Sequence, residues 1–526
     1  MARFSVREYC TEIEGREIMK SNTMIKRILT APVYDVARET PIDPMSFLSK
    51  RLHNQIQVKR EDLQPAFSFK LRGAYTCMVR LSPEQKKNGV VAASAGNHAQ
   101  GVAIAAAKLG IASTIFMPVT TPEIKVRGVR KLGGRFAKVI LEGDRFDDAC
   151  AQALEFARRE KQTFIHPYDD TDIISGQGTI GMEILRQRPT DLHAVFVPVG
   201  GGGLLAGVIT YIKYLRPDVR VIGVEADESA CLKAALDAGR RVKLAHTGIF
   251  ADGVSVAQIG KRPFSMIRDK VDDVITVTTD EICAAIKDLF DDTRSVAEPS
   301  GALALAGLKK YVRTKRIKNK SLVAIVSGAN SNFDRLRFVA ERHAVGEKRE
   351  VLLGVTIPEK PGSLLDLCRC AKGHDVTEFN YRYDNAAKAN VFLGIKVRDD
   401  GPDRERLIKR LRKQGFALRD LSGNALAKLH VCHMVGGHSR RIPEEVYRFE
   451  FPERAGILEH FLTVMRGRWN VSLFQYRQHG GTYAHVLVGL QEIPGTKHKI
   501  DTFLKELAFP YVRETDNPAY RMFLGD

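Results

Sequence analysis

The sequence predicts an α/β protein with parallel sheets over residues 90–330, followed by a smaller α+β region that contains a repeat. Short β-rich runs alternate with helical patterns between residues 90 and 330, and several of these runs end directly in glycine or serine. After residue 330 the pattern changes, and one proline-glycine motif occurs twice. Alternation of strands and helices favours parallel sheets flanked by helices. The chain has 526 residues, which is too long for one ordinary core.

The expected strands of the first region follow one another at similar intervals. They are the runs 90–93, 114–117, 139–141, 194–197, 219–224, 274–277 and 323–326. An open α/β sheet binds its ligands outside the carboxyl ends of its strands. The polar loops that follow these runs are therefore the first candidates for a functional site.

One lysine precedes these loops in an apolar setting. Lys70 lies between Phe69 and Leu71. A lysine can hold a carbonyl compound as an imine only if its amine is uncharged part of the time, which burial promotes. By itself, a lysine beside apolar residues is more often a surface residue whose stem packs while its amine reaches water.

A run of glycines gives the clearest indication of an anion site. Gly200, Gly201, Gly202 and Gly203 stand between the run 194–197 and a helical pattern that begins near Leu204. Successive N–H groups without a Cβ can wrap an anion at a helix N-terminus, where the helix dipole also favours negative charge. A tight turn without a ligand needs only one or two glycines, because each costs conformational entropy. We therefore predict a phosphate site.

Two further loops complete a possible cofactor site. The loop Ser94-Ala95-Gly96-Asn97-His98 offers amides, and the side chains of Ser94 and Asn97, to a carboxylate or a ring oxygen, although helix capping explains these two residues equally well. Ser327 ends the run 323–326 and could donate to a pyridine nitrogen, or could be a simple turn residue. An amine, amides for a phosphate and hydrogen bonds at a ring edge are what an aldehyde cofactor with a phosphate and a pyridine ring requires.

The tail contains two copies of one pattern. Residues 357–365 are echoed by 451–459, and residues 379–382 by 474–477 at nearly the same offset. In each copy a strand enters a Pro/Gly turn, and an amphipathic helix and alternating strands follow. We expect two βαββ-type modules. Packing or dimer contacts explain such copies as well as ligand binding does.

Composition limits the classes of partner. The net charge is +19, and much of the excess lies in residues 309–320 and 404–413, which we interpret as exposed sides of helices. Neither run is interleaved with aromatics or belongs to a nucleic-acid module, so we expect no nucleic-acid partner. The eight cysteines lack paired spacing, which favours reduced thiols. We expect no membrane span, no signal peptide and a cytoplasmic location, and an organellar destination for a longer precursor stays open.

The order of these elements resembles the pyridoxal-phosphate enzymes of the tryptophan-synthase-β fold group and, within it, the threonine dehydratase (threonine deaminase) family. Residues 60–64, 250–254 and 298–302 are also similar to segments of that family. The tail, with residues 421–424 and 427–430, resembles the ACT-like regulatory domain of the biosynthetic, isoleucine-sensitive branch. The resemblance implies a catalytic domain of PLP fold type II over residues 1–335, a connector over 336–349, and ACT-like α+β modules over 350–425 and 426–526.

The resemblance also implies roles for single residues. Lys70 would be the Schiff-base lysine and the general base, with Phe69 packed beside the cofactor. Asn97 would bind the ring hydroxyl, and Ser327 the pyridine nitrogen. The phosphate would be held by the amides of Gly200, Gly201, Gly202, Gly203 and Leu204. The substrate carboxylate would be held by Ser94, Ala95, Gly96, Asn97 and His98.

The activity implied is dehydration and deamination of L-threonine, with L-serine as a secondary substrate, to 2-oxobutanoate and ammonia. This is the first committed step of isoleucine biosynthesis, with isoleucine as inhibitor, valine as its opponent, and a homotetramer as the assembly. Ala95 stands where related serine racemases have a serine base, which disfavours racemisation. Those relatives also need an acid near Cys231 for a divalent cation, and only Glu225 and Glu228 are at hand, so we expect no metal.

Two other readings remain open. The first is an enzyme of the same fold that eliminates from serine or a diaminopropionate. The second is a catalytically silent, basic module that senses an amino acid. The repeat does not fix which residues bind an effector; the candidate regions are Pro361, Gly362, Gly456 and the strands that contain Phe379 and Phe474.

Overall fold

A computed structural model shows two compact units, Met1–Asn332 and Phe333–Asp526. The residues that it describes are 22–144, 146–188, 190–333, 335–346, 350–358, 363–371, 374, 376–381, 388–397, 401–424, 426–427, 431, 444–452, 461, 464, 469–477, 483–492 and 500–524.

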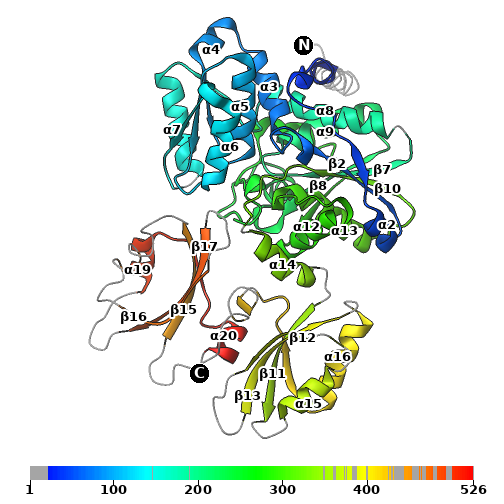
Figure 1. Ribbon diagram of the computed structural model, residues 1–526, viewed down its shortest axis with the longest axis vertical. Helices are drawn as coiled ribbons and strands as arrows, with labels where there is room; N and C mark the ends of the chain where they lie inside the picture. Colours follow the sequence, from blue (N-terminus) through cyan, green and yellow to red (C-terminus); the bar gives the residue numbers. More distant parts are fainter. Residues whose placement is uncertain are drawn as a thin grey trace, which may run out of the picture. The chain divides into compact units, whose positions relative to one another are not determined.

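The first unit is built around a six-stranded sheet of order β1-β2-β10-β7-β8-β9. Its strands are β1 (Ile42–Pro44), β2 (Gln55–Arg60), β7 (Leu192–Pro198), β8 (Arg220–Ala226), β9 (Asp273–Val277) and β10 (Ser321–Val326). All neighbours are parallel except β1, which pairs antiparallel with β2. The helices α8 (Thr171–Gln187) and α9 (Gly203–Leu215) cover one face, and α12 (Thr279–Thr293) and α13 (Pro299–Lys315) cover the other (Figure 1).

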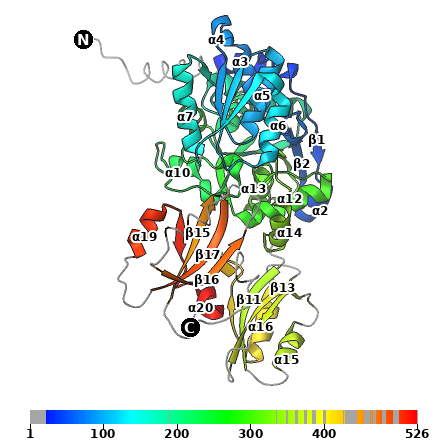
Figure 2. The ribbon, with the colours of Figure 1, turned by 60° about the vertical axis from the view of Figure 1, so that its left-hand side comes forward.

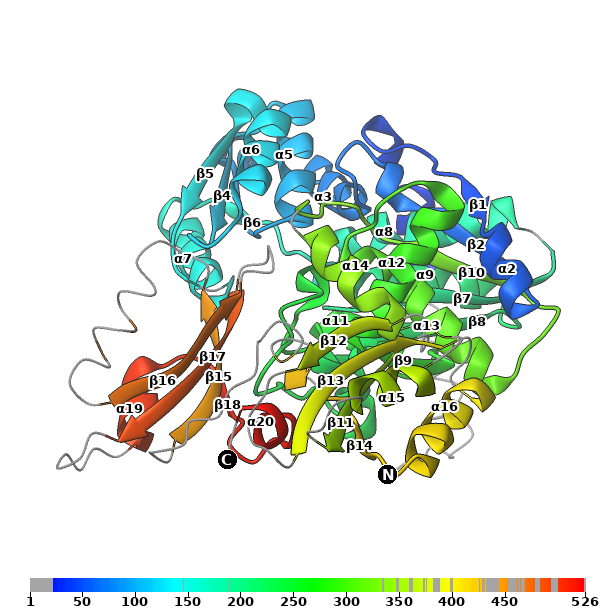
Figure 3. The same cartoon turned by 60° about the horizontal axis from the view of Figure 1, so that its bottom comes forward.

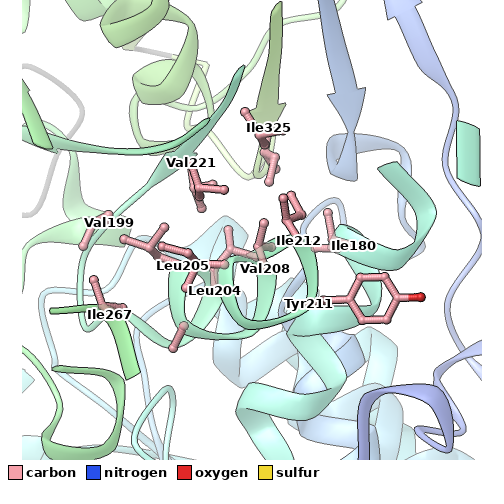
Figure 4. Packing of buried hydrophobic residues seen from close by; sticks show 14 of the residues in the cluster. Ile180, Val199, Leu204, Leu205, Val208, Tyr211, Ile212, Val221, Ile267 and Ile325 are labelled. Atoms are coloured by element: carbon pink, nitrogen blue, oxygen red, sulfur yellow. The ribbon is translucent and has the colours of Figure 1, made fainter. Parts of the chain in front are cut away.

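Helix α9 lies at the centre of this core. Its side chains are apolar almost all round because it is packed between α8 and the sheet. Figure 4 shows Leu205 and Val208 of α9 close to Val221 of β8. The contact with α8 requires a glycine, since a Cβ on Gly207 would lie 2.5 Å from the carbonyl oxygen of Ile174.

A second, four-stranded sheet of parallel strands has the order β5-β4-β3-β6. Its strands are β3 (Val90–Ala93), β4 (Ser113–Met117), β5 (Ala137–Leu141) and β6 (Thr163–Phe164). The helices α5 (Asn97–Leu109) and α6 (Glu123–Gly133) pack on one face and α7 (Phe146–Arg159) on the other (Figure 2). Helix α3 (Lys70–Val79) packs against both α5 and α8 and so joins the two sheets.

Shorter elements connect these layers. They are η1 (Val33–Asp35), α2 (Ser46–Leu52), η2 (Glu61–Leu63), α4 (Pro83–Asn88), η3 (Gly134–Phe136), η4 (Asp227–Ser229), α10 (Cys231–Asp237), η5 (Asp252–Val254) and α11 (Lys261–Ile267).

Each strand expected from the sequence is present, as β3, β4, β5, β7, β8, β9 and β10. Strands β1, β2 and β6 were not predicted. The interpretation of the basic runs is correct for most of their residues, which lie at exposed positions of α13 and α16 (Pro402–Lys413) and just beyond. It is wrong for Lys309, which is buried because its amine pairs with Asp288 of α12 at 2.5 Å.

The second unit contains two antiparallel sheets with the same strand order, β12-β13-β11-β14 and β16-β17-β15-β18 (Figure 3). After α14 (Arg335–Gly346), the first module comprises β11 (Glu350–Pro358), α15 (Ser363–Cys370), β12 (Val376–Tyr381), β13 (Lys388–Lys396), α16 and β14 (Ala417–Asp420). The second comprises β15 (Glu444–Pro452), β16 (Trp469–Arg477), β17 (Tyr483–Glu492), α19 (Ile500–Leu507), β18 (Tyr511–Arg513) and α20 (Pro518–Phe523). The expected βαββ unit is thus extended by a helix and an edge strand.

Helix α20 connects the two modules. Its side chains join a cluster with Phe392 of β13, and the rings of Phe392 and Phe523 lie 5.5 Å apart. The side-chain amide of Asn390 donates to the carbonyl oxygen of Met522 at 2.6 Å. The first sheet is therefore covered by α15 and α16 on one face and by α20 of the second module on the other (Figure 1).

Of the candidate regions for effector binding, the structure describes only the two strands. Phe379 and Phe474 lie in β12 and β16, which occupy equivalent edge positions of the two sheets. Pro361, Gly362 and Gly456 lie outside the described residues.

Candidate active site

The loops singled out from the sequence meet at the carboxyl ends of parallel strands. Residues 94–98 follow β3, the glycine run follows β7, and Ser327 follows β10. Lys70 begins α3, and the N–H of Phe69 donates to the carbonyl oxygen of Ser327 at 3.2 Å. The lysine and three strand ends that lie far apart in the sequence thus form one site.

The amine of Lys70 is held inside this site. Its Nζ donates to the carbonyl oxygen of Pro167 at 3.1 Å and lies 5.3 Å from the ring centroid of Phe69. Burial lowers the pKa of Lys70 to about 8, although the carboxylate of Glu298 acts in the opposite direction. A neutral amine is therefore accessible near physiological pH, as imine formation and proton abstraction both require.

The side chain of Asn97 is fixed by two partners. Its Nδ2 donates to Oε1 of Glu298 at 2.5 Å, and its Oδ1 accepts from Nδ2 of Asn330 at 2.7 Å. Asn330 is held in turn by the carbonyl oxygen of Ala66 at 2.8 Å. These bonds orient the amide of Asn97 so that the second hydrogen on its Nδ2 remains for an acceptor.

The glycine run forms an anion cradle at the start of α9. Within the described part of the chain, the backbone N–H groups of residues 200–204 donate to no protein acceptor. Gly202 has a φ of 88°, which favours glycine. A Cβ on Gly201 would lie 2.2 Å from Cγ of Tyr168, so a side chain there would displace the tyrosine ring. Free amides at a helix N-terminus suit a phosphate.

The loop 94–98 forms a second set of amides, at the start of α5. The N–H groups of Ala95, Asn97 and His98 find no acceptor among the residues that the structure describes. The hydroxyl of Ser94 accepts from the N–H of Gly96 at 3.2 Å and so shapes the loop.

The imidazole of His98 is turned away from this loop. Its Nε2 lies 2.8 Å from the carbonyl oxygen of Ile165, and since a carbonyl only accepts, Nε2 carries the hydrogen. Burial, together with the nearby charge of Lys70, lowers the pKa of His98 to about 3. His98 therefore contributes a backbone N–H group to the loop, while its neutral ring binds the carbonyl oxygen of Ile165.

Ser327 is buried, and its hydroxyl donates to the carbonyl oxygen of Ser300 at 3.1 Å. The hydroxyls of Ser68 and Ser300 are buried and have no hydrogen-bond partner in the described part of the molecule. Ser68 pairs through its backbone with Gly328, beside Ser327. Unsatisfied hydroxyls are rare in interiors and mark this end of the site as a place for a polar group. That Ser327 binds a ring nitrogen remains a prediction.

Several residues of the site were not assigned roles from the sequence. Glu298 lies in the segment 298–302 that is similar to the family, and Asn330 follows Ser327 by three residues, but nothing in the sequence indicated that both contact Asn97. The segment His166-Pro167-Tyr168 was missed because it follows β6, which has only two residues and leaves no pattern.

Among the described residues, no three His, Cys, Asp or Glu side chains come together in a way that could hold a metal ion. Glu225, near Cys231, is engaged at the start of α10, where its carboxylate accepts from the N–H groups of Leu232 and Lys233 at 2.7 and 2.9 Å. Burial raises the pKa of Glu225 to about 7. Within the described helices, none has the length and apolar character needed to cross a membrane.

Comparison with known proteins shows which family this chain belongs to. Residues 33–328 match the family described as pyridoxal-phosphate dependent enzyme, and residues 341–431 and 435–524 match the C-terminal regulatory domain of threonine dehydratase. The chain is 51% identical to L-threonine dehydratase biosynthetic IlvA of Burkholderia multivorans, over 96% of this chain and 100% of that protein. It is 50% identical to the IlvA protein of Escherichia coli, over 97% of this chain and 98% of that protein.

Among solved structures, the processed form of threonine deaminase isoform 2 from Solanum lycopersicum is 48% identical. It superimposes with a TM-score of 0.60 and covers 61% of this chain and 93% of its own length.

Proposed function

The chain belongs to the threonine dehydratase family of pyridoxal-phosphate-dependent enzymes, and on that premise we propose which of its residues convert L-threonine to 2-oxobutanoate and ammonia. The observation that carries the assignment is the position of the Lys70 amine, with its lowered pKa, beside Pro167. The next residue, Tyr168, lies against the glycine run.

The residues present fit pyridoxal phosphate. The N–H groups of residues 200–204 are free to hold its phosphate, Lys70 to hold its aldehyde carbon, and Asn97 to bind its ring hydroxyl. Phe69, whose ring lies beside the Lys70 amine, would pack against the cofactor ring, and Ser327 would bind the ring nitrogen. When bound, the cofactor supplies an electron sink that makes the α hydrogen of the amino acid acidic.

Lys70 acts as the general base. When it is not bonded to the cofactor, its Nζ would take the α proton of threonine, and the lowered pKa keeps part of the amine population neutral for this task. The carbonyl oxygen of Pro167 offers that amine a hydrogen bond, which limits the positions it samples.

The free amides of the loop 94–98 hold the substrate carboxylate at the start of α5, where the helix dipole favours an anion. Since the side chains of Ser94 and His98 are engaged within the protein, backbone N–H groups do most of this binding.

The second unit binds the regulators. We propose isoleucine as the inhibitor and valine as its opponent, a homotetramer as the assembly, and the cytoplasm as the location. We also propose residues 1–335 as the catalytic domain, 336–349 as the connector, and 350–425 and 426–526 as the regulatory modules. Any coupling between effector and substrate binding must be reciprocal.

The test is formation of 2-oxobutanoate from L-threonine, together with the absorbance spectrum of the bound cofactor, in Lys70→Ala. Lys87→Ala, an exposed lysine of α4, is the matched control. We expect Lys70→Ala to lose both product formation and the absorbance band, and Lys87→Ala to retain them. An unaltered spectrum in Lys70→Ala rejects the assignment, and faster turnover of L-serine or diaminopropionate by the parent rejects the choice of substrate.

A further inference from the structure

The segment between β6 and α8 contacts three parts of the catalytic site, which are the loop 94–98, Lys70 and the glycine run. The carbonyl oxygen of Ile165 lies 2.8 Å from Nε2 of His98, and that of Pro167 accepts from Lys70. Tyr168 lies against the glycine run, since a Cβ on Gly203 would come within 2.9 Å of its carbonyl oxygen. The conformation of this segment therefore decides where the amine of Lys70 is held.

The segment also fixes the starts of two helices, α8, which follows it directly, and α11, which lies far along the chain. The carboxylate of Asp169 accepts from the N–H groups of Lys261 and Arg262, at 2.8 and 2.9 Å, at the start of α11. Asp170 is the N-cap of α8 and accepts from the N–H groups of Asp172 and Ile173 at 2.8 and 3.0 Å.

The turn itself is held by one side chain. Nδ1 of His166 accepts from the N–H of Tyr168 at 3.2 Å and from the N–H of Asp169 at 2.8 Å. Because both partners are donors, Nδ1 must carry no hydrogen. Burial lowers the pKa of His166, which favours this neutral form. The ring packs edge-on against Tyr168, with centroids 4.7 Å apart, and against Phe164 at 6.2 Å.

We propose that His166 is a positioning residue for the reaction: its Nδ1 holds the turn of residues 166–169 so that the carbonyl of Pro167 faces the amine of Lys70. His166 touches neither substrate nor cofactor in this role, and it acts through Pro167 and Tyr168. The inference rests on the proposed role of Lys70. It adds His166 to the residues that the reaction needs, although His166 lies outside the motifs and loops to which a role was assigned.

Two substitutions of His166 test its hydrogen-bond acceptor and its aromatic ring separately. His166→Phe keeps a ring between Phe164 and Tyr168 and removes the acceptor. His166→Asn removes the ring and restores an oxygen that can accept the amides two and three residues ahead, as Asp170 does for α8. His193→Phe is the matched control, because His193 lies near the amino end of β7, away from the strand end that carries the site.

The first readout is turnover. We expect His166→Phe to lower kcat for L-threonine by at least about tenfold with KM changed by less than about threefold, and His166→Asn to stay within about threefold of the parent. His193→Phe should match the parent. Equal kcat in all three variants and the parent, or equal losses in His166→Phe and His166→Asn, overturns the proposal.

The second readout needs no cofactor. In the apoprotein, the pH midpoint for labelling of Lys70 by an amine-reactive reagent should move to lower pH in His166→Phe, because the amine loses a carbonyl oxygen that stabilises its ammonium form, and should be retained in His166→Asn. An unchanged midpoint in His166→Phe counts against the proposal. A parent that forms no 2-oxobutanoate would reject the proposed function, while this labelling contrast would still decide the role of His166.

If His166→Phe does not fold, the unsubstituted protein supplies the test. The N–H groups of Tyr168 and Asp169 should exchange slowly with deuterium, because Nδ1 of His166 accepts both. Rapid exchange of both amides overturns the proposal.

Discussion

The charge of the Lys70 amine is set by two opposing effects. Burial disfavours the ammonium form, and the carboxylate of Glu298 favours it; burial is the larger, so the pKa of Lys70 falls to about 8. At pH 7 roughly one such amine in ten is neutral, against fewer than about one in a thousand for an ordinary lysine. A single buried carboxylate thus prevents the pKa from falling further.

Labelling of the apoprotein over a pH series measures this balance. The midpoint for Lys70 should lie at about 8, well below that of a free amine added as internal standard. In Glu298→Gln it should move to lower pH, because the group that raises the pKa of Lys70 is removed. A midpoint equal to that of the standard in the unsubstituted protein would show that burial does not act on this amine.

The glycine run makes a second prediction at the scale of single residues. In Gly201→Ala the new Cβ overlaps the ring of Tyr168, so the cradle must open. Inorganic phosphate should then raise the melting temperature of the apoprotein much less than it does in the parent. Gly423→Ala, where a Cβ meets nothing within 4 Å, is the control and should respond as the parent does. Equal responses in all three proteins would place the anion elsewhere.

At the scale of elements, the helix that carries Lys70 is anchored by a buried ionic network. Arg72 of α3 binds Glu61 at 2.8 Å and Glu183 of α8 at 2.6 Å, and Lys59 of β2 binds Glu183 at 2.7 Å. All four side chains are fully buried. Two cations and two anions balance one another, so the interior tolerates them, and the start of α3 is held in place.

Removing one partner should be costly. Arg72→Met keeps the stem but leaves Glu61 and Glu183 with Lys59 as the remaining cation of the network, and should lower the free energy of unfolding by about 3–5 kcal/mol. Arg127→Met removes an exposed pair with Glu123 and should cost less than about 1 kcal/mol. Urea unfolding followed by circular dichroism measures both; similar values would mean that the network is dispensable.

Elements with a local sequence signal could be predicted, whereas β2, which belongs to this ionic network, could not. The glycine run, the Asn97 loop and the strands β3, β4, β5, β7, β8, β9 and β10 were predicted, because the signals of glycines, turn residues and β-rich runs lie within a few neighbouring positions. β2 was not predicted, since its end carries Lys59 and Arg60, which resemble exposed charges. Lys59 is buried only because Glu183, on a distant helix, neutralises it, and no local pattern links the two positions.

At the scale of the whole molecule, we expect regulation to depend on ligand binding to the second unit, which matches the regulatory domain of threonine dehydratase. Its two sheets repeat one strand order, so each offers a similar set of edges and faces. The sequence repeat predicted this duplication correctly, but the expected βαββ pattern lacked the last helix and the short edge strands β14 and β18, because these elements lie outside the repeated motif.

The only tryptophan of the chain, Trp469, lies in β16 and reports on the second unit alone. Isoleucine should shift the unfolding transition seen by its fluorescence, by about 2.7 kcal/mol at a concentration 100-fold above Kd. Threonine should not, because its site lies in the first unit. The same isoleucine concentration should lower the rate of 2-oxobutanoate formation. If the fluorescence transition does not respond, isoleucine does not bind this unit.

The position of α20 has a consequence during synthesis. One face of the first regulatory sheet stays incompletely covered after β14 has left the ribosome, because α20, which contributes part of the cover, begins only at Pro518. At ~5–20 residues per second the roughly one hundred intervening residues take about 5–20 s to translate. For that interval Phe392 lacks its contact with Phe523, and the nascent chain exposes the part of the apolar surface that α20 later covers, which chaperones can bind.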